Sequence, residues 1–330
     1  MTRFSKRNNV KDVGVMVELA QINEFAKKWI SKFEEPNVDY IELVDHYFAD
    51  DCRALGFAMD CGHAYNRKYP GTVGGYDHRR DSIANESNIA LLGSAVYSQW
   101  RYFNHWAYDG AEILEQRNRD WFCKILRRME ELSDSSVQGY VLCRNIRMLD
   151  DSGEIIPTTI TIKKQGITDL AVDAIVNAAN EGLMAGGGVC GAIFRAAGHT
   201  ELQNACDKIG HCDTGNAVMT AGFGLKAKCV IHSVGPVWNG GKHNEKKLLY
   251  SCYEKSLELA EKTGLHTVAF PLISAGIFGV PVDVAWRKAI QAVSEYQTRH
   301  PESAIEVIFA VLDDGIMSEG IKCVDSVLAE

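Results

Sequence analysis

The sequence predicts an α/β protein in which a mostly parallel sheet, covered by helices on both faces, follows an all-helical domain. Up to about residue 133, apolar side chains recur at the three-to-four-residue spacing of amphipathic helices. After residue 157, short and nearly continuous apolar segments alternate with helical ones, as in parallel sheets that are buried on both faces. We therefore divide the chain into a helical domain (1–133), a β-like linker (134–156) and an α/β domain (157–330).

The helical domain is predicted to contain about four helices, of ordinary length. The apolar residues that mark them are Phe25, Trp29 and Phe33; Ile41, Val44, Phe48, Cys52, Leu55 and Met59; Ile89, Leu92, Val96, Trp100 and Phe103; and Trp121, Ile125, Met129 and Leu132. Asn118 is predicted to be the N-cap of the fourth helix.

An aromatic segment, residues 88–107, lies within the helical domain. Its aromatic side chains are Trp100, Tyr102, Phe103, His105 and Trp106. We interpret this stripe as helix core, because apolar periodicity most often marks the buried face of a helix. A surface that covers a ligand or binds a partner protein is the alternative.

The second half of the chain alternates between strand and helix patterns. Two β-like segments, GYVLCRNIRML and IIPTTITIKK, are joined by the turn DDSG. Further strands are predicted at AVDAIVNAA, CVIHSVGP, TVAFPLIS and IEVIFAVL. Helical segments separate them: one long helix is predicted to end at Gly264, and the next has Pro281 in its first turn. A short terminal helix follows the last strand.

Composition excludes several classes of protein. The formal charge is -8 and there is no basic block, so binding to duplex nucleic acid is not expected. No apolar run approaches the roughly 18 residues of a membrane span, and no apolar signal-peptide core follows the basic N-terminus. The ten cysteines include no CxxC pair, which is typical of reduced thiols in a cytoplasmic protein. Cys61, His63, His78 and His105 fit no standard metal spacing, so we predict no metal and no cofactor.

Two glycine-bearing loops, AGGGVCG (185–191) and SAGIFGVP (274–281), each join a predicted strand to a helix. Glycine lets backbone N–H groups approach an anion closely, and the following helix N-terminus adds a favourable dipole. Facing each other at the carboxyl ends of the strands, the two loops could hold a diphosphate from both sides. Ordinary strand-to-helix turns are the alternative.

The spacing of the first loop also matches the Rossmann fingerprint, because Gly186, Gly188 and Gly191 spell GxGxxG. That motif requires the glycines to follow the strand tightly and an acidic residue to end a second strand. Here residues 180–185 intervene, and Asp207 lies in a helical stretch, so the Rossmann interpretation is weak.

Residues from about 157 to 330 resemble a macrodomain, the ADP-ribose-binding fold, of the MacroD-type bacterial branch. The segments that carry the resemblance are VDAIVNAAN, the glycine loop GGGV-G-AI-RAAG, TGNAVMT, CVIHSVGPVWNGG and VAFPLISAGIFGVP. The resemblance implies a mixed sheet sandwiched between helices. It also implies a hydrolase that removes mono-ADP-ribose from acidic side chains or deacetylates O-acetyl-ADP-ribose. A non-catalytic reader of ADP-ribose or a related nucleotide is the alternative.

The resemblance also implies a set of site residues. Asn180 would touch the distal ribose and position the catalytic water, and Phe278 would stack near that ribose. Cys190 occupies the place of a family aspartate that helps to activate the water. The predicted ligand-binding residues are Asn177, Gly186, Gly187, Gly188, Val189, Ile167, Ser274, Ala275, Gly276, Ile277, Phe278, Gly279 and Leu312.

Three positions depart from the family pattern. Cys190 replaces the aspartate, although the family is thought able to use a substrate phosphate for the same task. Gly166 stands where the family has an aspartate that receives the adenine amino group, and Leu312 stands where many members have an aromatic residue against adenine. The distal half of the predicted site is therefore better matched than the adenine half.

Two residues near the predicted site have alternative interpretations. Cys190 lies beside a helix N-terminus, where a cysteine can act as a nucleophile, but no histidine partner is evident in the sequence. We interpret it as a small residue that fills the place of the aspartate. His232 is predicted to be a buried strand histidine. The expected partner is ADP-ribose or an ADP-ribosylated protein, and the helical domain is a candidate surface for a partner protein.

Overall fold

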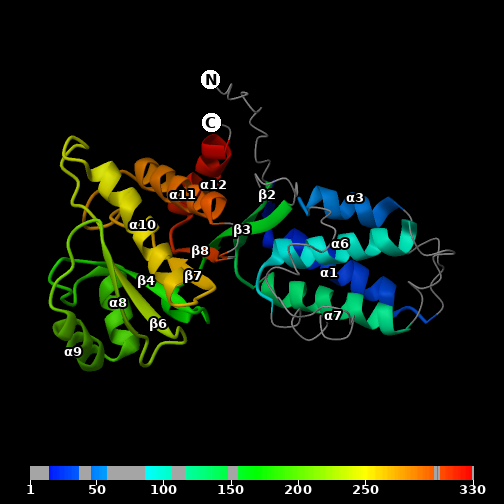
Figure 1. The fold of residues 1–330 in the computed structure, drawn as a ribbon, viewed down its shortest axis with the longest axis horizontal. Helices are drawn as coiled ribbons and strands as arrows, with labels where there is room; N and C mark the ends of the chain where they lie inside the picture. Colours follow the sequence, from blue (N-terminus) through cyan, green and yellow to red (C-terminus); the bar gives the residue numbers. More distant parts are fainter. Residues whose placement is uncertain are drawn as a thin grey trace, which may run out of the picture.

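The computed structural model describes residues 15–36, 46–57, 86–105, 116–134, 136–147, 155–300, 303 and 305–328. An α/β region, on the left of Figure 1, adjoins a region of helices on the right, and strands β2 and β3 run between them. The predicted order, helices first and then alternating strands and helices, is confirmed. No helix among these residues is long and apolar enough to cross a membrane.

One eight-stranded sheet runs through both regions, in the order β1-β2-β3-β8-β7-β4-β6-β5. Its strands are β1 (Val15–Glu18), β2 (Gly139–Arg147), β3 (Ile155–Lys164), β4 (Ala174–Ala179), β5 (Ala217–Ala221), β6 (Cys229–Val234), β7 (Thr267–Phe270) and β8 (Glu306–Val311). The run β3-β8-β7-β4-β6 is parallel, and the remaining pairs are antiparallel. The predicted mixed, mostly parallel sheet is confirmed. Neither β1 nor β5 was predicted.

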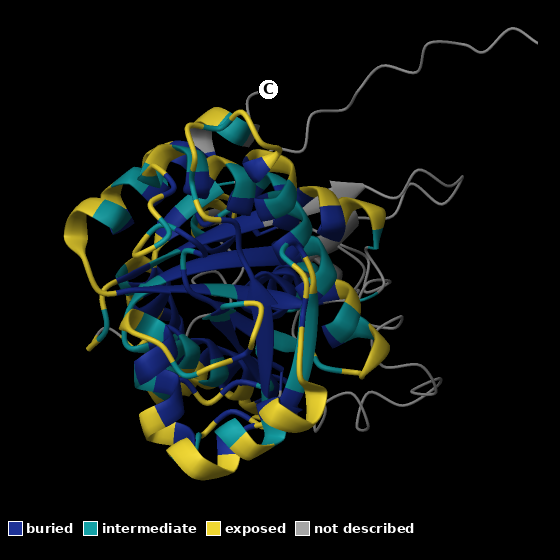
Figure 2. Cartoon of the chain, turned by 90° about the vertical axis from the view of Figure 1, so that its left-hand side faces the viewer, coloured by how far each residue is buried: buried dark blue, intermediate teal, exposed yellow. Residues whose placement is uncertain are grey.

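Helices cover both faces of the parallel part of the sheet, so its strands are largely buried (Figure 2). They are α8 (Gly188–Ala197), α9 (His199–Ile209), α10 (Glu245–Lys262), α11 (Val282–Arg299) and α12 (Asp314–Leu328). The apolar core under α10, α11 and α12 is separate from the core under α8 and α9. The predicted sandwich of a sheet between helices is therefore confirmed.

Four predicted helix limits are corrected. The helical stretch after the first glycine loop is two helices, because Gly198 adopts φ 96° and separates α8 from α9. The long helix α10 ends at Lys262, two residues before Gly264. Pro281 is the N-cap of α11 and so precedes its first turn. The last helix, α12, has 15 residues and is longer than predicted.

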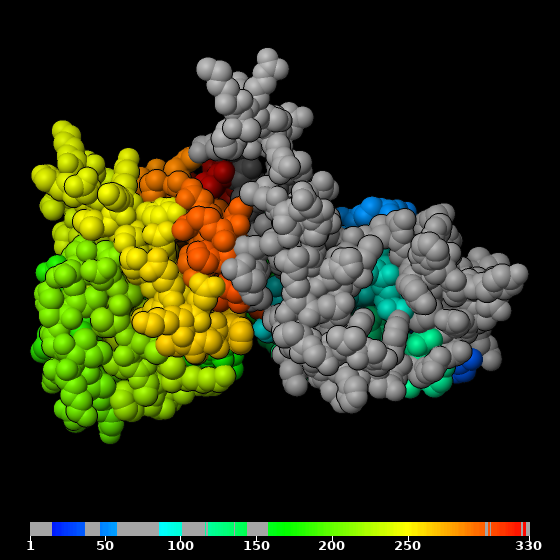
Figure 3. All heavy atoms as spheres, viewed as in Figure 1, coloured from blue at the N-terminus to red at the C-terminus, as the bar shows by residue number. Residues whose placement is uncertain are grey.

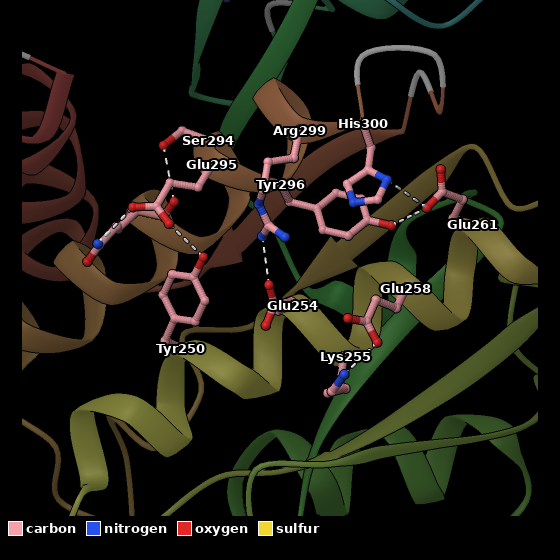
Figure 4. Close-up of polar contacts among 11 residues, drawn as sticks. Tyr250, Glu254, Lys255, Glu258, Glu261, Ser294, Glu295, Tyr296, Arg299 and His300 are labelled. Carbon is pink, nitrogen blue, oxygen red and sulfur yellow. Dashed lines mark hydrogen bonds and ion pairs between the residues drawn. The ribbon is translucent and has the colours of Figure 1, made fainter. Parts of the chain in front are cut away.

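Polar contacts join α10 to α11, which lie side by side on one face of the molecule (Figure 3). The Tyr250 hydroxyl donates to a Glu295 carboxylate oxygen at 2.7 Å, and Arg299 donates to Glu254 at 2.6 Å (Figure 4). Burial and the Glu295 carboxylate raise the pKa of the Tyr250 hydroxyl to about 12, so it stays a donor at neutral pH. These contacts hold together the two helices that follow the segments after β6 and β7.

The helical region contains α1 (Leu19–Glu34), α3 (His46–Ala54), α6 (Ile89–His105) and α7 (Gln116–Leu132) among the described residues. Its core is aromatic and centres on the fully buried Phe48. The Phe48 ring lies 4.7 Å from that of Trp29 and 5.9 Å from that of Trp100. Trp100 is 5% exposed, which confirms its interpretation as helix core.

One further prediction for the helical region is wrong, and several others concern residues outside the described ones. The N-cap prediction for Asn118 is wrong, because α7 already begins at Gln116 and Asn118 lies in its first turn. The side chains of Tyr102, Phe103 and His105 lie outside the described residues, as does Trp106. Cys61, His63 and His78 also lie outside them, and the residues that are described contain no cluster suited to a metal ion.

Strand β2 belongs to both regions. Val141 and Cys143 point into the aromatic core of the helical region, whereas Leu142 points into the core under α10 and α11. A further contact crosses the boundary at the start of β8, where the Ser87 hydroxyl donates to Glu306 at 2.9 Å. The helical region is thus joined to the sheet by a shared strand.

Candidate ligand-binding site

The candidate site lies at the carboxyl ends of the parallel strands β3, β4, β6, β7 and β8, where open α/β sheets bind ligands. Two glycine-bearing segments emerge there. One (180–187) follows β4 and leads into α8, and the other (271–281) follows β7 and leads into α11. These segments contain the two glycine loops predicted from the sequence.

The first glycine loop ends on the uncapped N-terminus of α8. Gly187 is the N-cap and makes no side-chain cap hydrogen bond. Backbone N–H groups in the first turn of a helix lack partners within the helix, so an anion can accept from them. Gly191 must lack a side chain, because a Cβ there would lie 2.5 Å from the Gly186 carbonyl oxygen. The loop is therefore folded tightly against its own helix.

The second loop is closed by backbone hydrogen bonds. Gly279 N–H donates to the Gly276 carbonyl at 3.0 Å, and Val280 N–H donates to the Ser274 carbonyl at 3.0 Å. Ser274 adopts φ 61°, a left-handed conformation that is uncommon for a residue with a side chain. Its hydroxyl is buried and makes no hydrogen bond to any described residue. A buried hydroxyl of this kind is a candidate donor to a ligand.

The two loops touch each other. A Cβ on Gly187 would lie 3.1 Å from the Ile277 Cδ1 atom, so the Ile277 side chain reaches across to the first loop. Ile277 is nevertheless 79% exposed, because it sits at the rim of both loops. The opposed arrangement that the sequence predicted is therefore present in the structure.

The side chains of Asn180 and Cys190 both lie against the backbone of Met184. The Asn180 amide donates to the Met184 carbonyl at 2.8 Å, and its oxygen accepts from the Met184 N–H at 3.0 Å. The Cys190 thiol faces the same carbonyl at 3.9 Å and is 5% exposed. An amide has two donors and accepts at two positions, so Asn180 retains one of each for a ligand or a water.

Asn177 lies beneath the loops, where it is 1% exposed. Its amide nitrogen is 3.1 Å from His232 Nδ1, and His232 Nε2 is 3.0 Å from the Thr220 hydroxyl. If the amide donates to Nδ1, the ring proton sits on Nε2 and is donated to Thr220. Burial lowers the pKa of His232 to about 4, so the ring is neutral. This confirms the prediction of a buried strand histidine and suggests that Asn177 supports the site from below.

Among the described residues, no histidine is a hydrogen-bond partner of Cys190. His232 instead lies beside Cys206, with 3.7 Å between Sγ and Nε2. Burial raises the pKa of the Cys206 thiol to about 11, and the His232 pKa lies well below that value. Proton transfer from Cys206 to His232 is therefore unfavourable, and this cysteine–histidine pair is structural.

The predicted base-binding residues lie at the ends of β3 and β8. Ile167 is 6% exposed and begins the short helix η2 (Ile167–Asp169), which follows β3 directly. Leu312 follows β8 and is 74% exposed. The Gln165 N–H donates to the Val311 carbonyl at 3.0 Å, so the two strand ends stay side by side. An apolar ligand group placed there would contact Leu312.

One contact was missed by the sequence analysis. The Trp238 N–H donates to the Phe278 carbonyl at 2.8 Å, which ties the segment after β6 to the second glycine loop. Trp238 belongs to the segment CVIHSVGPVWNGG, but nothing in its spacing indicates which backbone atom it meets. The segment after β6 therefore lies against the second glycine loop at Phe278.

The fold and the two opposed glycine loops define a class of α/β proteins that hold an anionic ligand on backbone amides. Comparison with known proteins narrows this class. The family model of the Macro domain matches residues 176–289. An O-acetyl-ADP-ribose deacetylase of Escherichia fergusonii is 49% identical over 161 residues, which cover 47% of this chain and 89% of that protein. A macro domain-containing protein of Chlorobaculum tepidum is 53% identical over 152 residues, 46% of this chain and 87% of its own.

A solved structure agrees with these relatives. The Oceanobacillus iheyensis macrodomain with ADP has a TM-score of 0.51 and 30% sequence identity, and the match covers 57% of this chain and 98% of that one. The chain belongs to the macrodomain family. The resemblance inferred from the sequence is thereby confirmed.

Proposed function

We propose that this protein binds ADP-ribose and hydrolyses bonds at its distal ribose. The substrates would be O-acetyl-ADP-ribose, protein carrying mono-ADP-ribose on acidic side chains, or both. The observation that carries the proposal is the contact between the two glycine loops at Gly187 and Ile277, above the uncapped N-terminus of α8. The name of the Escherichia fergusonii relative, an O-acetyl-ADP-ribose deacetylase, supports the same activity.

The diphosphate would lie between the loops and be held by neutral donors. The backbone N–H groups of residues 186–189 and 276–278 would donate to it, since those of Ala275 and Gly279 already donate within the second loop. The dipole of α8 favours negative charge at its N-terminus. The buried Ser274 hydroxyl, which makes no hydrogen bond to the described residues, adds one more donor. Such an arrangement selects for a diphosphate by shape, because no cationic side chain has to be paired.

Hydrolysis of the acetyl ester requires a water to attack the carbonyl carbon. Asn180 would orient that water through the acceptor position that Met184 leaves free. The water would lose its proton to a substrate phosphate, since Cys190 supplies no carboxylate. The carbon–oxygen bond to the ribose then breaks, the ribose oxygen takes a proton, and acetate and ADP-ribose are released.

A non-catalytic reader of ADP-ribose is the second candidate. The observation in its favour is Cys190, whose buried thiol faces the Met184 carbonyl at the position of the family aspartate. Without a carboxylate there, ligand binding can persist while water activation is lost.

Turnover of O-acetyl-ADP-ribose by paired variants tests the proposal. We expect Asn180→Ala to lower kcat about 100-fold or more, in the range of a lost water-positioning or oxyanion contact, and Cys190→Ser to keep most of the activity. Auto-ADP-ribosylated protein provides the second substrate, and circular dichroism checks the fold of each variant. Complete loss of activity in Cys190→Ser would instead support a thiol nucleophile.

Calorimetric titration separates the remaining outcomes. ADP-ribose should bind far more tightly than AMP, because AMP lacks the second phosphate and the distal ribose. A wild-type protein that binds ADP-ribose without turning over either substrate would be a reader. Equal affinity for ADP-ribose and AMP would show that the glycine loops do not hold the diphosphate.

We also propose a cytoplasmic location and a separate role for residues 1–133. The free cysteines among the described residues are mostly buried, which suits a reducing compartment.

About half of this chain matches the relatives, and the match covers most of their own length. The helical region is therefore an addition to the part that this chain shares with them. Such an addition suits the recruitment of a partner protein.

A further inference from the structure

The carboxylate of Asp169 lies in the space that a side chain at position 166 would fill. A Cβ built on Gly166 would be 2.7 Å from Asp169 Oδ2. Asp169 ends the helix η2, and its N–H donates to the Gly166 carbonyl at 3.1 Å, so this one turn of chain folds the carboxylate back over Gly166. The backbone carbonyl of Asp169 also accepts from Lys226 at 3.3 Å.

The backbone does not require glycine at position 166. Its φ of -62° and ψ of 130° are allowed for any residue. What a side chain there would disturb is the position of the Asp169 carboxylate. The Asp169 carboxylate therefore occupies a position that is open because residue 166 has no side chain.

The carboxylate lies at the base-binding end of the candidate site. Gly166 and η2 follow β3, and the exposed Leu312 follows the neighbouring strand β8. Ile167 shares a buried apolar core with Cys190 of α8, so η2 packs next to the helix that carries the first glycine loop. A ligand between the glycine loops can thus extend toward the exposed Leu312 and the exposed carboxylate of Asp169.

We propose that Asp169 accepts a hydrogen bond from the exocyclic amino group of the bound base and makes the site specific for a 6-aminopurine. The inference rests on the proposed function, because it concerns the same ligand. An ionised carboxylate only accepts hydrogen bonds, so it pairs with the amino group of adenine and repels the 6-oxo group of hypoxanthine. A site built around a charged acceptor discriminates strongly against a partner that has no donor to offer.

The arrangement also accounts for the absence of an acidic side chain at position 166. The family aspartate would begin at the Cβ position that Asp169 Oδ2 approaches. Asp169 supplies the same chemical group from three residues further along, through the turn of η2. The adenine half of the site is therefore complete, with its acceptor carried by a different residue.

Calorimetric titration with ADP-ribose and with its hypoxanthine counterpart tests the inference. The wild type should prefer ADP-ribose by about tenfold or more, the size expected for one hydrogen bond to a charged group. Asp169→Ala should weaken ADP-ribose binding by about tenfold and reduce the preference to near unity. Asp213→Ala, which removes another exposed carboxylate of the same domain, should change neither value.

A second pair of variants separates the role of Asp169 as an acceptor from a structural role. Gly166→Asp should restore the preference for adenine in the Asp169→Ala protein, because the acceptor returns to the same space. The same substitution in the wild type should not tighten binding, since two carboxylates would compete for that space.

The experiment distinguishes failure of the Asp169 inference from failure of the proposed ADP-ribose binding. An unchanged base preference in Asp169→Ala, or equal binding of both nucleotides by the wild type, would overturn the inference and leave ADP-ribose binding intact. A wild type that binds neither nucleotide would overturn both. Loss of preference that Gly166→Asp fails to restore would assign Asp169 to the shape of the turn and not to the base.

Discussion

The helical region and the candidate site use their backbones in opposite ways. Around Phe48, aromatic rings fill the space between helices whose backbone groups are paired within those helices. In the glycine loops, many residues have no side chain, a helix N-terminus has no side-chain cap, and the buried Ser274 hydroxyl makes no hydrogen bond to the described residues. One region gains stability from packing, and the other leaves polar groups available for a ligand.

The difference teaches which substitutions should affect stability and which should affect binding. In a packed core, removing a side chain leaves a cavity and lost contacts. In a glycine loop, adding a single methyl group blocks a backbone approach. Stability and affinity should therefore respond to different residues, and the two sets should overlap little.

The largest expected effect is on stability. Phe48→Ala should lower the free energy of unfolding by about 3–5 kcal/mol, because the ring is fully buried among other aromatic rings. Urea denaturation measures the change. The neighbouring Tyr47 is 66% exposed, so Tyr47→Ala should cost less than about 0.5 kcal/mol. A folded Phe48→Ala protein with tenfold weaker ADP-ribose binding, about 1.4 kcal/mol, would contradict the separation of the two regions.

A smaller effect is expected on binding. Gly191→Ala should weaken ADP-ribose binding by about 10- to 100-fold, since its Cβ would push the Gly186 carbonyl out of the loop. Gly182→Ala is the matched control in the same connection, because a Cβ there makes only ordinary contacts, the nearest at 3.5 Å to Met184. Titration calorimetry compares the two. Equal losses in both variants would show that the loop tolerates the shift and that its shape does not set affinity.

The smallest effect is expected from removing the helical region. A chain that begins at Gly153, just before β3, should bind ADP-ribose within about threefold of the full chain, because both glycine loops, Asn180 and Asp169 are retained. A chain that begins at Gly139 should melt higher than the Gly153 chain, since it keeps the pairing of β2 with β3 and keeps Leu142 in the core under α10 and α11. A folded Gly153 chain with tenfold weaker binding, about 1.4 kcal/mol, would make the helical region part of the site.

Most of the fold could be predicted from local patterns. The apolar residues of the buried strands and long helices recur at regular spacing, and the glycine loops can be recognised from their composition. Strand β1 could not be found in this way, because four residues carry too little pattern and its pairing with β2 is set by the tertiary fold. The N-cap prediction at Asn118 failed because an asparagine inside the first turn has the same local signal as one at the cap.

The candidate site was predicted less completely than the fold. The glycine loops and Asn180 were found, because their residue types are distinctive in sequence. The position of Asn177 against His232 could not be, since it depends on the pairing of β4 with β6. Gly166 looked like a missing acceptor, because sequence spacing does not show that the Asp169 side chain folds back over it.

The shared strand β2 has a consequence for how the chain assembles. Residues 15–132 are synthesised first, yet their core includes Val141 and Cys143 of β2. Strand β2 pairs with β3, and β3 pairs in parallel with β8, almost at the end of the chain. Contacts between residues so far apart in sequence form late, because closing a long loop precedes the gain from pairing. The core of the N-terminal helices can therefore close once β2 has been synthesised, whereas the sheet to which β2 belongs is completed only when β8 arrives.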